Sequence, residues 1–280
     1  MTKFGIIVED NPISRCYLNI FLKKNIKFDS IIYLSKKNFF LKKLTLYRNF
    51  YLNNFYAINF LKDKNLLDVI SYIEEFFSYR QGFCKDMYKF SNLLKISNKI
   101  IFTGNNLINS KETINILKNE KSKIYLNTGS QILRDVLDTN HKFLHIHPGY
   151  LPLVKGADGT LWHIKNFNNL GVSAFFMSSK IDEGEILLRD KFILPKLKIK
   201  NFNKYDTQSL YRFWFSFFDP LLRGTLLTKL IDMEFDVKKI PILDDEVNSG
   251  FYFSFMQEKD KKQIFKKIFF DGKYREISKS

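Results

Sequence analysis

The side chains best suited to acid–base chemistry are gathered in one short part of this chain. The 4 histidines comprise three at 141–147 and His163 shortly after them. His145 and His147 are two residues apart, so on a β-strand their side chains point to the same face. Pro148 follows directly and ends the regular strand, which places both imidazoles at a strand tip. An imidazole titrates near neutral pH and can remove a proton from an amine.

A His-x-His pair is also compatible with two other roles. As a metal site, His145 and His147 could supply two ligands, with His163 or Asp182 as a third. No other part of the sequence has metal-ligand spacing. Because acid–base chemistry can account for this one pair, we expect that no metal is required. As structural residues, strand-end histidines would only hydrogen-bond neighbouring loops, and this is the role expected of His141 and His163.

An acid–base imidazole needs a carboxylate that orients the ring and tunes its pKa. Asp182 is the best candidate, because it lies in a Gly-containing turn between two expected strands. Asp158 and Glu183 are the alternatives, the first as an ordinary loop acid and the second as a solvated turn residue.

The elements that must position these residues alternate between strand and helix. Apolar runs predict strands at 3–10, 28–35, 98–106, 123–130 and 142–152. The segments between them predict helices at 13–24, at 110–120 with Ser110 as N-cap, and at 131–139. This order is typical of parallel βαβ units, and hence of a Rossmann-like α/β fold with a mostly parallel sheet and helices on both faces. Such sheets bind ligands beyond the C-terminal ends of their strands, where Gly104, Gly129 and His147 fall.

The remaining segments extend this pattern on both sides. Residues 37–97 are expected to be mostly helical, in an order that the sequence does not resolve. Strands are expected at 171–179 and 185–194, and 204–233 predicts a long aromatic helix or a pair broken near Asp219-Pro220. We therefore expect an α/β catalytic domain over 1–200 and a mainly helical C-terminal extension over 201–280.

Composition narrows the class of protein. A hydrophobic content of 45% and a charged content of 26% are typical of a soluble globular protein. The net charge of +16 favours a generally basic surface over a dedicated polyanion groove, and it would also attract an anionic small substrate. Two cysteines cannot form a disulfide framework. Without a signal peptide or an apolar run long enough for a spanning helix, the chain is expected to be cytoplasmic and not inserted in a membrane.

A series of motifs in one order resembles the catalytic core of the formyltransferases that use 10-formyltetrahydrofolate. That core has a strand-end Asn-x-His-Pro, a Leu-Pro, a basic-Gly pair, a Gly-Val-Thr/Ser strand and an Asp-x-Gly turn. The matching segments of this chain are His-Ile-His-Pro at 145–148, Leu-Pro at 151–152, Lys-Gly at 155–156, Gly-Val-Ser at 171–173 and Asp-Glu-Gly at 182–184. The resemblance covers about residues 123 to 190.

The resemblance implies roles for the matching residues. His147 would be the general base, or the cation that faces the developing oxyanion, and Asp182 would pair with it. The residue at position 145 would hydrogen-bond the formyl oxygen. This chain departs from the family pattern twice, with His145 in place of the Asn and Phe175 in place of a His. An imidazole can donate one hydrogen bond, so His145 could replace the amide as the oxyanion donor.

The resemblance also implies the co-substrate, 10-formyltetrahydrofolate. By position, its contacts would be Gly129, Ile132 and Leu133 after one strand, and the backbone of Lys180 and Ile181 beside the Asp182 turn.

Several acceptors of the formyl group fit such an enzyme. An amino sugar carried on a nucleotide is the first choice, because an anionic nucleotide suits a basic surface. Methionyl-tRNA is the second, which makes a nucleic-acid partner less favoured, and glycinamide ribonucleotide is the third. A non-catalytic family member that acts as a binding protein is the alternative from another class, since His145 and Phe175 depart from the pattern. A homodimer is compatible with the sequence, which does not determine the oligomeric state.

Overall fold

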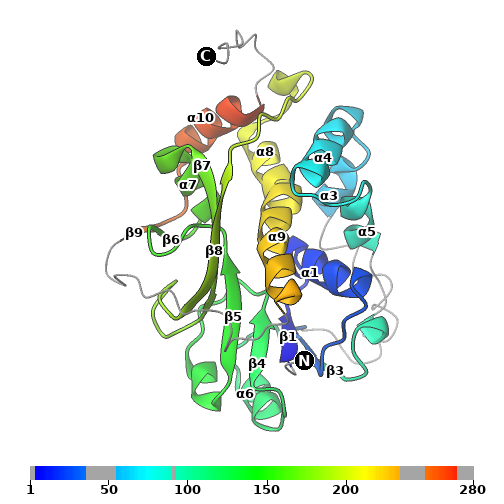
Figure 1. The fold of residues 1–280 in the computed structure, drawn as a ribbon, viewed down its shortest axis with the longest axis vertical. Helices are drawn as coiled ribbons and strands as arrows, with labels where there is room; N and C mark the ends of the chain where they lie inside the picture. Colours follow the sequence, from blue (N-terminus) through cyan, green and yellow to red (C-terminus); the bar gives the residue numbers. More distant parts are fainter. Residues whose placement is uncertain (1–3, 36–54, 90–92, 234–249, 270–280) are drawn as a thin grey trace.

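A mostly parallel sheet forms the centre of the molecule. The computed structural model describes residues 4–35, 55–89, 93–233 and 250–269. The strands of the sheet are β1 (Phe4–Val8), β2 (Ile31–Tyr33), β3 (Ile100–Phe102), β4 (Ile124–Asn127), β5 (Lys142–His147), β7 (Asn169–Phe176) and β8 (Ile186–Ile193). Within the described residues the sheet has seven strands in the order β3-β2-β1-β4-β5-β7-β8 (Figure 1). The first five in that order are parallel, whereas β7 and β8 are antiparallel to their neighbours. The expected α/β fold is confirmed.

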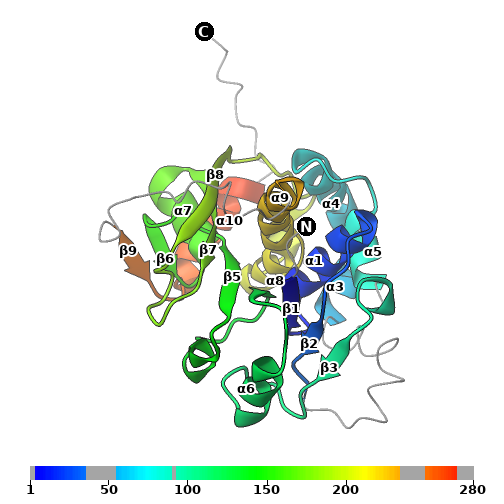
Figure 2. The ribbon, with the colours of Figure 1, turned by 60° about the horizontal axis from the view of Figure 1, so that its bottom comes forward.

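Helices cover both faces of this sheet. They are α1 (Pro12–Lys23), α3 (Phe55–Phe60), α4 (Lys64–Phe76), α5 (Phe83–Lys89), α6 (Lys111–Lys118), α7 (Gly159–Phe167), α8 (Thr207–Phe213), α9 (Asp219–Asp232) and α10 (Glu258–Phe269). Ile6 of β1 belongs to the larger core with α1 and α9, whereas the next residue, Ile7, belongs to a second core with α6. Figure 2 shows α6 on the opposite side of the sheet from α1 and α9. Because successive side chains of a strand point to opposite faces, the sheet contributes to one apolar core on each face.

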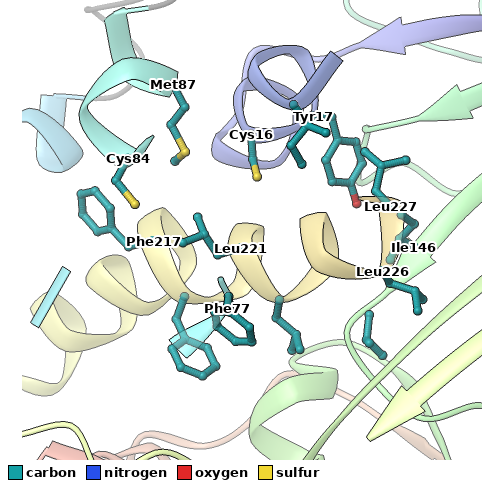
Figure 3. Packing of buried hydrophobic residues seen from close by; sticks show 14 of the residues in the cluster. Cys16, Tyr17, Phe77, Cys84, Met87, Ile146, Phe217, Leu221, Leu226 and Leu227 are labelled. Carbon is teal, nitrogen blue, oxygen red and sulfur yellow. The ribbon is translucent and has the colours of Figure 1, made fainter. Parts of the chain in front are cut away.

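The larger core joins the C-terminal helices to the sheet. Figure 3 shows Cys16 and Tyr17 of α1 facing α9, with Leu226 of α9 near Ile146 of β5. The aromatic residues of α8 and α10 belong to the same core as the strands. The C-terminal helical extension is thus present and packed on the sheet, and the expected domain division at residue 200 stays a prediction.

One expected helix is largely absent from the structure. The helix expected at 131–139 is only a short 3-10 turn, η2 (Asp135–Thr139). Polar side chains explain the difference, because the Arg134 N–H donates to Asn109 and the Gln131 side chain donates to the Asn106 carbonyl, which ties this segment to the preceding loop. In the region 37–97, α3, α4 and α5 follow one another, and the helical residues expected at 37–54 and 90–92 lie outside the described residues.

The helix expected at 204–233 continues past Pro220 instead of breaking there. Helix α8 leads into a π-helical turn, η4 (Trp214–Phe218), and then into α9, which has Pro220 in its first turn. Proline lacks the N–H that would donate to the Ser216 carbonyl four residues earlier. The buried Tyr88 hydroxyl donates to that carbonyl instead, at 2.7 Å. A side chain from α5 therefore satisfies the acceptor that Pro220 leaves open.

A small second sheet, which the sequence did not predict, lies beside the main one. Strand β6 (Val154–Gly156) pairs in parallel with β9 (Phe251–Phe253), which comes from the far end of the described chain. Among the described residues, no helix combines the length and the apolar character that crossing a membrane requires.

Tyr88→Phe tests the role of the substitute hydrogen bond. Removing the hydroxyl leaves the buried Ser216 carbonyl without this donor, so the free energy of unfolding should fall by about 1–3 kcal/mol. Tyr72→Phe is the matched control, because Tyr72 is exposed and its change should stay within about 0.5 kcal/mol. Urea denaturation measures both, and equal values for the two variants would contradict this account of Pro220.

Candidate active site

The two strand-end histidines lie on one face of the sheet, as expected. In the antiparallel pairing of β5 with β7, His145 is opposite Phe175 and His147 is opposite Ser173. The His147 ring is buried, with 3% of the residue exposed. Two glycines make room for it: a Cβ at Gly149 would lie 2.7 Å from His147 Nε2, and a Cβ at Gly159 would lie 3.0 Å from it. The glycines that follow the strand therefore admit the ring.

Asp182 returns to this strand end from the connection between β7 and β8. Its Oδ2 lies 3.4 Å from His147 Nδ1, so the expected pairing of these two residues is confirmed. The same oxygen accepts the Gly156 N–H at 2.6 Å. Asp182 has φ +51°, a left-handed conformation that Asp tolerates better than most residues. The backbone of β6 thus holds the carboxylate against the imidazole.

Both nitrogens of the His147 ring face protein atoms. Nε2 lies 3.0 Å from the Val154 carbonyl oxygen, which can only accept, so Nε2 carries the hydrogen. Nδ1 faces Asp182, and these two groups can share one proton. Burial lowers the pKa of His147 below its usual range, and the Asp182 charge opposes that shift. Burial therefore favours the neutral ring, whereas Asp182 favours the protonated one.

His145 is arranged differently. Its Nδ1 lies 3.2 Å from the Asn127 carbonyl oxygen of β4, so Nδ1 carries the hydrogen and Nε2 of the neutral ring bears a lone pair. Burial, and then the positive charge of Arg223, lower the pKa of His145 to about 4. The edge of the ring meets the Phe175 ring, with centroids 6.0 Å apart. The expectation that His145 donates to a formyl oxygen stays a prediction, and this geometry requires the protonated ring for it.

A buried ion pair lies behind the two histidines. Arg223 Nη1 donates to the Ile146 carbonyl, between His145 and His147, at 2.6 Å. Its Nε donates to Asp219 at 2.7 Å, and the Thr160 hydroxyl donates to the other oxygen of that carboxylate. Sequence reasoning missed this group. The four-residue spacing of Asp219 and Arg223 was its signal, but many exposed helix pairs share that spacing.

The rival residues have structural partners. Asp158 is buried and accepts the Tyr211 hydroxyl and the Met256 N–H, so it joins the loop before α7 to the C-terminal helices. The Glu183 carboxylate pairs with Lys155 at 2.8 Å. As expected, the other two histidines bond neighbouring segments, through Thr139 for His141 and the Asn169 carbonyl for His163.

The residues expected to contact the folate differ in exposure. Ile132 and Ile181 are 48% and 38% exposed, although both are apolar. Leu133 lies in the second core with 1% exposed, so its side chain is not available to a ligand. The Gly129 N–H is taken by the Asn127 side chain, and the Lys180 N–H by Ser178.

No metal cluster is found in the part of the chain that the structure describes: no three His, Cys, Asp or Glu side chains there are grouped so that they could hold an ion. That the protein needs no metal stays a prediction.

Comparison with known proteins gives likenesses of structure only. No family model and no curated protein sequence matches the chain. A sugar N-formyltransferase from Shewanella sp. FDAARGOS_354 matches 91% of this chain and 77% of its own, with 16% identity and a TM-score of 0.47. WlaRD, a sugar 3N-formyl transferase solved in the presence of dTDP and 5-N-formyl-THF, matches 91% of this chain and 70% of its own, with 20% identity and a TM-score of 0.43.

A third likeness is to protein Rv3404c from Mycobacterium tuberculosis. The match covers 55% of this chain, with 13% identity and a TM-score of 0.39. It spans 63% of that protein, which is less than two thirds of its length.

Arg223→Ala tests the buried ion pair. The variant leaves the Asp219 carboxylate buried and without its cation, so the free energy of unfolding should fall by about 3–5 kcal/mol. Lys200→Ala is the control, because the Lys200–Asp68 pair is 71% exposed at both side chains and its loss should cost at most about 1 kcal/mol. Chemical denaturation measures both variants. A loss at Arg223 no larger than that of the control would show that the pair does not hold the strand end.

Asp182→Asn tests the electrostatic link to His147. The carboxylate raises the pKa of His147 against burial, so its removal should lower that pKa further. The His147 ring proton resonance, followed by NMR between pH 4 and 8, measures the shift. Glu183→Gln is the control, because the neighbouring carboxylate pairs with Lys155 and should leave the His147 titration unchanged. A His147 pKa that stays constant or rises in Asp182→Asn would refute the link.

Proposed function

We propose that this chain is an enzyme that transfers a formyl group from 10-formyltetrahydrofolate to the amine of a small substrate. One observation carries the proposal: Asp182 lies against the ring of His147 at the end of β5, with His145 on the same face. The same three positions belong to the motifs that resemble the formyltransferase core. The geometry thus supports the pairing of His147 with Asp182 that the resemblance implies.

The reaction makes two demands on the protein. As the amine attacks the formyl carbon, negative charge grows on the formyl oxygen, and the amine must also lose a proton. The folate, as substrate, supplies the activated formyl group and leaves as tetrahydrofolate. His147 with Asp182, and His145 beside them, are the side chains that we assign to these demands. The burial of His147 keeps water from its ring, so fixed charges and dipoles act more strongly there than in solution.

The segments that follow the C-terminal ends of β4 and β7 suit a flat, partly apolar co-substrate. Ile132 follows β4 and Ile181 precedes Asp182, and both keep apolar surface open to solvent. Gly129, two residues after β4, adds no side chain to this edge. We assign the folate to these three residues and to the backbone of Lys180 and Leu133.

For the acceptor we favour an amino sugar carried on a nucleotide. The net charge of +16 would attract its phosphates over a distance. The same charge suits methionyl-tRNA, so an assay with both acceptors must distinguish a small nucleotide from a nucleic acid.

The decisive assay combines the purified protein with 10-formyltetrahydrofolate and a panel of nucleotide-linked amino sugars, with methionyl-tRNA alongside. Mass spectrometry should find a formyl group on an amino sugar, matched by release of tetrahydrofolate. His147→Ala should lower kcat, because it removes the ring that Asp182 contacts beside His145. Lys200→Ala, an exposed change, should retain the rate.

Two results would count against the proposal in different ways. Binding of 5-formyltetrahydrofolate in calorimetry, without transfer to any amine, would favour a binding protein that keeps the fold. The absence of folate binding at millimolar concentration would remove the formyltransferase assignment itself.

A further inference from the structure

We propose that His145 is the catalytic residue that accepts the proton from the attacking amine, on Nε2, and that His147 acts beside it without taking that proton. This inference rests on the proposed formyl transfer. It concerns the position at which this chain has a histidine where the family pattern has an asparagine, which can donate a hydrogen bond but cannot serve as a base.

The tautomer of His145 is set by a rigid backbone acceptor. The Asn127 carbonyl that takes the Nδ1 hydrogen belongs to β4, which pairs with β1 and β5 on either side. The Asn127 side chain is also fixed, since it accepts from Gly129 and donates to the Met177 sulfur. Because the carbonyl cannot move away or donate, the neutral ring must keep its lone pair on Nε2. Among the described residues, no hydrogen bond to that nitrogen is found.

His147 offers no comparable nitrogen. Its Nε2 hydrogen is directed at the Val154 carbonyl, and its Nδ1 faces Asp182. Gly149 and Gly159 close around the ring so tightly that neither could carry a side chain. A substrate amine would have to displace protein atoms in order to reach either nitrogen of His147.

Burial, and then the charges around His145, keep its ring neutral, so that Nε2 bears a lone pair. Arg223 from α9 and His147 on the same strand disfavour its protonation, and Asp182 from the β7–β8 connection favours it. On β7 the opposite residue is the uncharged Phe175, and on β4 the contact is the Asn127 carbonyl. With burial added, the pKa falls to about 4, so the ring is neutral at pH 7. A weakly basic ring also releases its proton readily.

The proton balance of the step is complete. As the amine nitrogen bonds to the formyl carbon, its proton moves to Nε2 of His145. As the bond between that carbon and the folate nitrogen breaks, the same proton passes from Nε2 to the leaving nitrogen. His145 ends neutral, the formamide keeps the formyl group, and no further reactant is consumed.

His145→Asn and His145→Ala separate the base from a hydrogen-bond donor. Because neither side chain can accept the proton, both variants should lose about 10²–10⁴ in kcat. Added imidazole should restore part of the rate in His145→Ala, which has space for it, and should leave the wild type unchanged. A rate in His145→Asn close to that of the wild type would show that His145 is a donor. Full activity in both variants would show a packing role.

Two further measurements keep the outcomes distinct. Binding of 5-formyltetrahydrofolate and unchanged urea unfolding would show that the variants are folded and that the loss is chemical. The ¹H–¹⁵N NMR spectrum of the free protein at pH 7 reports the tautomer without any turnover, with the rings assigned by comparison with His145→Asn. We expect His145 with a hydrogen on Nδ1 and none on Nε2. A hydrogen on Nε2 would overturn the inference even if the protein transferred no formyl group.

Discussion

The hydrogen bond from Arg223 to the Ile146 carbonyl is the contact on which the arrangement of the site depends. It reaches the main chain of β5 between the two histidines, from a helix that lies on the other face of the sheet. A buried guanidinium is tolerated only with good partners, and Asp219 supplies one. A helix of the larger apolar core therefore also fixes the backbone of β5 between the two histidines on the opposite face.

The same cation shapes the electrostatics of both rings. It lies close enough to disfavour protonation of His145 and of His147, while Asp182 on the opposite side favours it. Two imidazoles on one strand face thus experience opposed charges from two layers of the protein. The two rings differ in their nearest hydrogen-bond acceptors. His145 faces the Asn127 carbonyl of β4, whereas His147 faces the Val154 carbonyl and the Asp182 carboxylate. Two histidines that are two residues apart therefore differ in their chemistry because different backbone groups surround them.

Periodicity and order of motifs predicted the parts of this site that are local. The two histidines at the end of β5 and the turn at Asp182 were visible because each belongs to a strand boundary. The tautomer of His145 was not predictable, because a main-chain carbonyl sets it and carbonyls have no sequence signature. Arg223 was hidden for another reason: its target is a backbone atom across the sheet. The helix expected around Arg134 does not form, because the Asn109 side chain in the preceding loop takes the Arg134 N–H.

The pairing of β6 with β9 has a consequence for how the protein is made. Gly156, whose N–H holds Asp182, is also the residue that pairs with Phe253, and a side chain at Gly156 would collide with the Phe253 carbonyl. A segment from the last part of the described chain thus supports the loop that places the acid. During synthesis on the ribosome, the sheet can assemble early, but the acid gains its full support only after residues 251–253 have emerged. The support of Asp182 would then be completed late, after the strands of the main sheet have been made.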